Sequence, residues 1–278
     1  MKKINNNFLI SPSDLNNFIA CKYTIKNNIR FLNKEIKKKE ETVDQKIRKK
    51  FGNDHEEKYF QIFKKKYKSH RIINRDDGEE KRAKDTIDSM EKGLDFIYHA
   101  YFIENNFRGE ADFLLKVDTP SKKWRYSYEV YDTKISRKIK TRHLQQIIAY
   151  SYFIESIQGS LPKKMYLIDG SSKTHQFKPK EFINQFLFAK EQFENFLLNE
   201  KKEEIYPEKC SFCSLCEWSE VCENLWVKDN YINQVARINR SQTGKLKKEN
   251  INTVEILSKK EVSEIKSKIN TNTIERLI

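Results

Sequence analysis

The sequence has few residues that make tight turns, with only 7 glycines and 5 prolines among 278 residues. An all-β sandwich or barrel needs many such turns, so the composition argues against both classes. No apolar run approaches the roughly 20 residues that a membrane-spanning helix needs. The first ten residues end in only Phe8, Leu9 and Ile10, which is too short for a signal-peptide core. We therefore expect a cytoplasmic protein that does not bind a membrane.

The charge of the chain is strongly positive, since 54 Lys and Arg face 40 Asp and Glu, for a net charge of +14. Such an excess favours a polyanionic partner such as a nucleic acid. Much of it lies in lysine runs beside acidic residues, at 37–39 and 64–66, so solvated helix faces explain it equally well. The 18 Phe and 13 Tyr supply enough apolar area for a core, which argues against wholesale disorder.

The order of apolar patterns predicts an α/β protein of the α+β type, with a mixed sheet flanked by helices. A helix starts at the capping pattern 11–14, Ser-Pro-Ser-Asp. A second helix over about 44–67 carries an apolar stripe with His55 on its buried side. The stripe consists of Ile47, Phe51, His55, Tyr59 and Ile62. Further helices are expected at about 79–92, 141–157 and 181–199, and strands at 96–104, 107–117, 125–135, 165–168 and 175–177.

Two aspartates and a lysine fall on two consecutive predicted strands. Asp132 and Lys134 are two residues apart, so both side chains point to one face. A hairpin turning near 119–123 would place Asp112 roughly opposite Asp132. Carboxylates that close repel each other, and a divalent cation would relieve the repulsion. Asp-x-Lys alone is common and usually a surface pair, but an aspartate inside the apolar run 111–115 needs a partner.

Gln146 and Tyr150 are four residues apart on the next predicted helix, so they share one face. An ordinary amphipathic helix with Leu144 and Ile147 on its core side would explain them as well. His55 by itself is more readily explained as a core histidine than as a ligand.

Together and in this order, these motifs resemble the RecB-like branch of the PD-(D/E)XK nuclease superfamily. The motifs are His55, Gly109-x-x-Asp112, Asp132-x-Lys134 and Gln146-x-x-x-Tyr150. The resemblance implies a restriction-endonuclease-like core. It also implies that Gln146 and Tyr150 organise the site and contact nucleic acid. The superfamily often has Glu at the position of Asp132, and Asp is an allowed variant.

The resemblance further implies a catalytic metal ion. His55, Asp112 and Asp132 would bind Mg²⁺ or Mn²⁺, with the backbone carbonyl of Thr133 as a further ligand. Lys134 would be the catalytic lysine that assists the attacking water.

The five cysteines point to a second metal site. Cys210, Cys213, Cys216 and Cys222 lie close together in the sequence, and Cys21 is distant. Structural disulfides are rare in cytoplasmic proteins. Zinc ribbons normally use two well-separated Cys pairs, whereas the two-residue gaps here are closer to iron–sulfur spacing. Five unligated thiols are the alternative.

RecB-like nucleases that hold a 4Fe–4S cluster have a similar cysteine layout. They carry one Cys in the N-terminal helix region and Cys-x2-Cys-x5-Cys after the nuclease core, as do CRISPR-associated iron–sulfur exonucleases and AddB. The resemblance implies Cys21, Cys213, Cys216 and Cys222 as the ligands of a structural cluster. Cys210 is then spare and remains an alternative to Cys21.

The C-terminal segment 245–257 resembles a helix-hairpin-helix, which offers backbone N–H groups to a phosphate. Asn250 stands where that motif has Gly, and Asn tolerates the left-handed conformation. An ordinary helical hairpin with a Lys-rich face is the alternative. We expect a nuclease domain with the cysteines over 1–228 and a DNA-binding segment over 229–278. In similar bacterial proteins more sequence, often an RNase H-like domain, follows, which implies additional C-terminal domains or a helicase partner.

The sequence thus predicts a divalent-metal-dependent deoxyribonuclease that hydrolyses phosphodiester bonds, as an exonuclease in DNA repair, recombination or processing. The expected partner is DNA that is single-stranded or has single-stranded ends. The alternative is a non-catalytic DNA-binding module with a structural four-cysteine zinc or iron–sulfur site. The intact Asp112, Asp132 and Lys134 favour the enzyme.

Overall fold

The computed structural model describes residues 1–4, 7–199 and 204–278. The chain divides into two compact units, which we call the sheet unit and the cysteine unit. The sheet unit comprises Met1–Asn16 and Glu40–Glu200, and the cysteine unit comprises Asn17–Lys39 and Lys201–Ile278. Among the described residues, no helix has the length and apolar character to cross a membrane.

This division differs from the predicted boundary between residues 228 and 229. One apolar cluster joins Tyr23 and Trp226 to Tyr231 and Leu277. Because the cysteine segment shares its core with the C-terminal segment, the two form one unit instead of separate parts.

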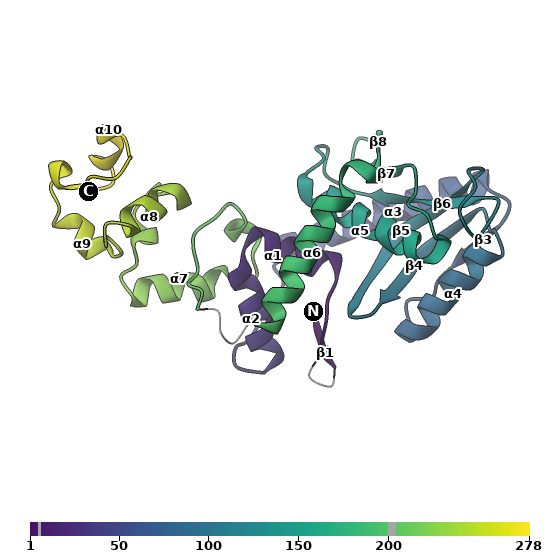
Figure 1. Cartoon of the computed structure of the whole chain (residues 1–278), viewed down its shortest axis with the longest axis horizontal. Coiled ribbons are helices and arrows are strands. Elements are labelled where there is room, and N and C mark those ends of the chain that lie inside the picture. The colour runs from purple at the N-terminus through teal and green to yellow at the C-terminus, as the bar shows by residue number, and fades with distance from the viewer. Residues whose placement is uncertain (5–6, 200–203) are drawn as a thin grey trace. The chain divides into compact units, whose positions relative to one another are not determined.

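The sheet unit is built on one six-stranded mixed sheet in the order β3-β4-β5-β6-β7-β8, and Figure 1 shows it with α3, α4 and α5. The pairs β3/β4 and β6/β7 are parallel and the others antiparallel. The predicted mixed sheet of the α+β class is therefore confirmed. Its strands are β3 (His70–Ile72), β4 (Phe96–Glu104), β5 (Phe107–Val117), β6 (Ser127–Thr133), β7 (Met165–Ile168) and β8 (Thr174–Phe177). The helices of this unit are α3 (Val43–Lys66), α4 (Glu79–Glu91), α5 (Thr141–Gln158) and α6 (Ile183–Leu198).

The sequence missed three short strands: β1 (Lys2–Ile4), β2 (Asn7–Leu9) and β3. The predicted helix start is confirmed at α1 (Pro12–Ala20), where Asp14 N–H donates to Ser11 Oγ and Ser11 N–H donates to Asp14 Oδ2. This reciprocal bonding satisfies N–H groups that the first turn of a helix leaves free.

The predicted apolar stripe of α3 is wrong at three of its five positions. Ile47, Phe51 and Ile62 are exposed, at 46%, 60% and 43%. The helix instead packs through Tyr59, Phe60 and Phe63, which join the strand residues of one apolar cluster. The aromatic pair at positions 60 and 63 offers more area to the sheet than the stripe does, and this sets the rotation of the helix.

Helices α3 and α5 cover opposite faces of the sheet, as two adjacent residues of β7 show. Met165 contacts Ser151 of α5, with Oγ–Sδ at 3.8 Å. Its neighbour Tyr166 stacks on Tyr131, which in turn contacts Phe63 of α3. Successive side chains of a strand point to opposite faces, so the two helices lie on different sides.

Strand β4 reverses this alternation. Tyr98 stacks on Phe60 of α3, with ring centroids 4.5 Å apart, whereas Phe102 stacks on Phe153 of α5 at 5.2 Å. Residues four apart in a regular strand would share a face. The reversal lies at His99, which has a φ of 58° and whose ring centroid is 3.6 Å from that of its neighbour Tyr98.

The cysteine unit consists of short helices around the shared apolar cluster. Trp218 anchors it, since the buried indole N–H donates to Asn28 Oδ1 at 2.8 Å. Asn250 adopts a φ of 60° between two short helices, so the predicted left-handed turn is confirmed. The helices of this unit are α2 (Lys22–Leu32), α7 (Ser219–Lys228), α8 (Arg240–Lys247), α9 (Val254–Ser258) and α10 (Thr271–Ile274).

The start of α5 depends on a neutral histidine, and this makes it sensitive to acid. Nδ1 of the buried His143 accepts a hydrogen bond from the backbone N–H of Lys140 at 3.3 Å. Burial, then the charges of Lys134, Arg142 and Lys140, lowers the pKa of His143 from 6.5 to about 4. The unfolded chain therefore binds this proton more readily than the folded chain between these two values.

We predict that the free energy of unfolding falls as the pH is lowered from about 6.5 to 4, by up to about 1.4 kcal/mol per pH unit from this group. Above pH 6.5 the contribution is fully present. Urea unfolding of wild type and His143→Gln across this range measures it, because Gln accepts the same bond without titrating. Equal pH slopes in the two proteins would contradict the assignment.

Candidate active site and cysteine cluster

Asp112 and Asp132 face each other across β5 and β6. Phe113 pairs with Tyr131, so the register places Asp112 opposite Asp132, as the predicted hairpin requires. Asp112 Oδ2 accepts two hydrogen bonds from Thr133, from the backbone N–H at 2.7 Å and from Oγ1 at 2.8 Å. The end of β6 thus holds both carboxylates in place.

Neither carboxylate is fully compensated by protein groups. Asp132 is 0% exposed, and neither of its oxygens has a hydrogen-bond partner among the described residues, although Oδ2 forms an ion pair with Lys134. Burial, followed by the charge of Asp132, raises the pKa of Asp112 well above its usual range. Burial also raises the pKa of Asp132. A divalent cation would remove this repulsion, and carboxylate oxygens suit Mg²⁺ or Mn²⁺.

Lys134 follows the last residue of β6 and remains an ammonium ion. Its backbone N–H donates to the Ile168 carbonyl at 2.8 Å, which continues the pairing with β7. Burial alone would lower the pKa of Lys134, but the charges of Asp132 and Asp112 raise it. The predicted arrangement of Asp132 and Lys134 on one side is confirmed by their ion pair. A protonated amine donates hydrogen bonds and positive charge, and it does not accept a proton.

Gln146 and Tyr150 of α5 form the predicted pair, since Gln146 Nε2 donates to the Tyr150 hydroxyl at 2.8 Å. Burial, then the charge of Asp132, raises the pKa of Tyr150 well above its usual range, so the phenol stays neutral. A Cβ on Gly109 would lie 3.0 Å from the Tyr150 ring, closer than normal packing allows. Gly109 therefore lets this ring approach β5 closely.

The structure does not assemble the whole predicted ligand set. His55 is half-buried, with its Nε2 buried and lacking a hydrogen-bond partner in the described part of the chain. Its ring meets the Tyr59 ring edge-on, at 5.3 Å between centroids. Within residues 1–4, 7–199 and 204–278, no three His, Cys, Asp or Glu side chains converge on one metal position. The metal ligands His55, Asp112, Asp132 and Thr133 therefore stay a prediction.

Sequence reasoning missed a largely buried histidine–carboxylate pair beside the two aspartates. His99 Nε2 lies 2.7 Å from Glu56 Oε1, and their side chains are 11% and 12% exposed. Burial alone would raise the pKa of Glu56, but the hydrogen bond and charge of His99, with the charge of Arg75, lower it. The charge of Glu56 in turn raises the pKa of Asp112 and of Asp132. The one signal in the sequence was a histidine inside the otherwise apolar run of β4.

All five cysteines line one small cavity within the cysteine unit. Backbone N–H groups point at two of the sulfurs, from Cys210 to Cys213 Sγ at 3.3 Å and from Trp218 to Cys216 Sγ at 3.4 Å. Burial, then the charges of Cys216, Cys21 and Cys213, raises the pKa of Cys222 to about 12. Several neighbouring thiols with raised pKa values lose their protons together only when a metal ion binds them.

Thiol sulfurs are the donor type that zinc and iron–sulfur clusters prefer, although in the described residues no three of these thiols converge on one metal position. The choice between Cys21 and Cys210 stays open. Both line the cavity, and Cys210 Sγ lies 3.9 Å from Cys213 Sγ. Cys21 stands at the N-cap of α2. Its proximity contributes to the raised pKa of Cys216 and of Cys222.

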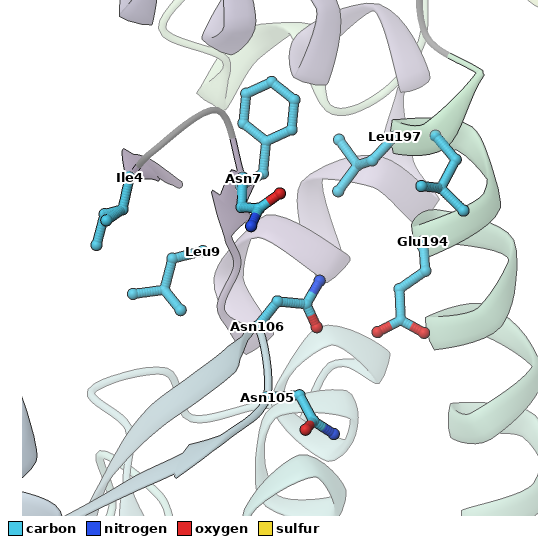
Figure 2. Close-up of a pocket in the computed structure, with 9 residues that line it drawn as sticks. Ile4, Asn7, Leu9, Asn105, Asn106, Glu194 and Leu197 are labelled. Carbon is cyan, nitrogen blue, oxygen red and sulfur yellow. The ribbon is translucent and has the colours of Figure 1, made fainter.

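A separate groove of about 830 Å³ lies in the sheet unit. Figure 2 shows that the strands β1 and β2, the β4–β5 turn and α6 surround it, with Asn7, Asn105, Asn106 and Glu194 as its polar side chains. None of the predicted site residues lines this groove. It therefore plays no part in the candidate active site.

Comparison with known proteins leaves the family of this chain open. No family model matches the sequence, and no curated protein matches it.

Proposed function

We propose that the sheet unit is a divalent-metal-dependent nuclease that hydrolyses phosphodiester bonds in DNA. The observation that carries the proposal is a pair of facing carboxylates, of which Asp132 is fully buried and Asp112 half-buried, with the Lys134 ammonium at Asp132. Two carboxylates this close and largely shielded from water repel each other unless a cation lies between them, so such a pair is typical of a metal site.

Each residue of the site has its own role in the proposed reaction. Asp112 and Asp132 would hold the cation, which when bound would offset charge on the phosphate oxygens and acidify a water molecule. Lys134 keeps its proton and donates to the attacking water or to a phosphate oxygen. Tyr150 stays neutral and, held by Gln146, offers a polar group to the substrate.

We further propose an exonuclease of DNA repair, recombination or processing that acts on single-stranded DNA or on single-stranded ends. Support comes from the net charge of +14 and from the left-handed turn at Asn250. In this proposal the thiol cavity of the cysteine unit holds a 4Fe–4S cluster with a structural role.

A non-catalytic DNA-binding module is the second candidate. It is favoured by one observation, that in the described ranges no three metal-ligating side chains converge. Metal-dependent cleavage distinguishes the two candidates.

Replacing Asp132 by Asn should abolish metal-dependent cleavage, and Lys134→Gln should slow it by about 10²–10⁴-fold. Mn²⁺ should raise the unfolding temperature of wild type but not of Asp132→Asn, because only a bound cation stabilises the folded state. The measurements are cleavage of labelled single- and double-stranded DNA and thermal unfolding with and without Mn²⁺.

The matched control is Asp95→Asn, which alters another half-buried aspartate that accepts backbone N–H bonds from Lys68 and Ser69. It should lose some stability but keep its cleavage and its response to Mn²⁺. Full cleavage activity in Asp132→Asn would rule out the proposed site.

The cysteines give a test that is independent of cleavage. Anaerobically purified protein should be brown and contain about four irons per chain. Cys213→Ala, Cys216→Ala and Cys222→Ala should each lose the iron. Cys21→Ala should lose it too, whereas Cys210→Ala should keep it, if the layout of the similar nucleases holds. The reverse result at the last two positions would make Cys210 the ligand, and stoichiometric zinc would reject the cluster.

DNA affinity should fall steeply with salt, because each bound phosphate releases counterions. Deleting the C-terminal segment would open the apolar core of the cysteine unit, so a point change tests the hairpin better. Lys248→Gln, at an exposed residue after α8, should lower the slope of log affinity against log salt by about 0.7–0.9. Lys84→Gln, which alters a lysine paired with Asp88 on α4, is the control and should leave the slope unchanged. A flat salt dependence in wild type would mean that the lysines are merely solvated.

A further inference from the structure

We infer that His99 is a positioning residue of the proposed site, and that its left-handed backbone keeps the imidazole away from Asp112 and paired with Glu56. The inference depends on the proposed metal site. It assigns a role to a residue that makes no contact with substrate in the proposed reaction.

His99 lies in the same row of the sheet as the two aspartates. Tyr98 pairs with Phe113 and Ala100 with Ala111, so His99 stands opposite Asp112 on β5. Asp112 in turn stands opposite Asp132 on β6. The three residues thus occupy successive strands at one level.

A regular strand would put the His99 ring on the face opposite to Tyr98, on the side of α5. There the imidazole would stand beside its row partner Asp112 and compete with a cation for the carboxylate. At a φ of 58° the ring instead lies next to Tyr98, on the side of α3. This backbone conformation therefore clears one side of Asp112.

The reversal extends to the neighbouring strand at the same level. Phe113 contacts Phe63 of α3, with ring centroids 5.0 Å apart. Gly109, four residues earlier on β5, faces the Tyr150 ring of α5. Both strands thus change face around the row of His99 and Asp112.

Glu56 holds the reversed imidazole in place. Its Oε1 lies 2.7 Å from His99 Nε2, and Arg75 Nη2 lies 3.8 Å from the same oxygen. Arg75 also donates from Nε to Glu110 Oε1 at 2.7 Å, on β5 two residues before Asp112. Non-glycine residues rarely adopt positive φ without such support. The charged groups that face His99 therefore fix its conformation from α3 and, through Arg75, from β5.

The test measures Mn²⁺ binding by titration calorimetry and by the loss of the free-ion electron paramagnetic resonance signal, without a cleavage assay. Glu56→Ala should weaken Mn²⁺ binding about tenfold, because the freed imidazole turns toward Asp112. Adding His99→Gly to Glu56→Ala should restore binding to within about threefold, because Gly adopts the left-handed conformation unaided and carries no imidazole.

Single substitutions at position 99 separate backbone conformation from packing. His99→Gly and His99→Asn tolerate positive φ and should bind Mn²⁺ within about threefold of wild type, whereas the β-branched His99→Val should weaken binding about tenfold. Packing alone would give the opposite order, since Val fills more of the site than Gly.

The matched control is His175→Ala, which removes another histidine–carboxylate pair, with His175 Nε2 at 2.7 Å from Asp169 Oδ2. It should leave Mn²⁺ binding unchanged. If Glu56→Ala with His99→Gly binds as weakly as Glu56→Ala, Glu56 acts on the cation directly and the inference is wrong. Equal affinities for all variants would also overturn it. Wild type that binds no Mn²⁺ and cleaves no DNA would overturn the proposed function itself.

Discussion

The carboxylates of Asp112 and Asp132 lie opposite each other at one level of the sheet and repel each other, and the contacts around them limit the cost of that repulsion. Asp112 is held by the backbone and hydroxyl of Thr133, and Asp132 is paired with Lys134. These contacts reduce the cost of the two charges but do not cancel it, since burial still raises the pKa of both aspartates. In the proposed metal site, a bound cation would offset this repulsion between the two carboxylates.

The neighbouring strand β4 and helix α5 determine which side chains lie next to the two carboxylates. Ordinary strand alternation would crowd the row of Asp112 with the His99 ring, and the left-handed turn of β4 moves that ring to Glu56. On the other side of the sheet, Gly109 allows Tyr150 to approach as a neutral phenol. One backbone reversal and one missing side chain thus shape the space next to the carboxylates.

In the cysteine unit, too, burial and close neighbours raise the pKa of several side chains, which here are thiols. Five thiols line one cavity, and mutual proximity together with burial raises the pKa of Cys210, Cys216 and Cys222. Hard carboxylate oxygens in one unit and sulfurs in the other suit different kinds of metal. The shared core of Trp226 and Tyr231 explains why the cysteine segment groups with the C-terminal hairpin.

Local patterns in the chain were enough to predict the mixed sheet, the register that brings Asp112 opposite Asp132, and the pairing of Gln146 with Tyr150. These features depend on periodicity, turn position and helical spacing, which a short stretch of residues carries by itself. The rotation of α3 follows instead from tertiary packing, because burial of Phe60 and Phe63 outweighs the stripe through Ile47 and Phe51. The roles of Glu56 and His99 also emerge only in the folded chain, since a positive φ at a histidine leaves no pattern in the sequence. Such a conformation arises only when groups from distant segments, here α3 and β4, stabilise it together.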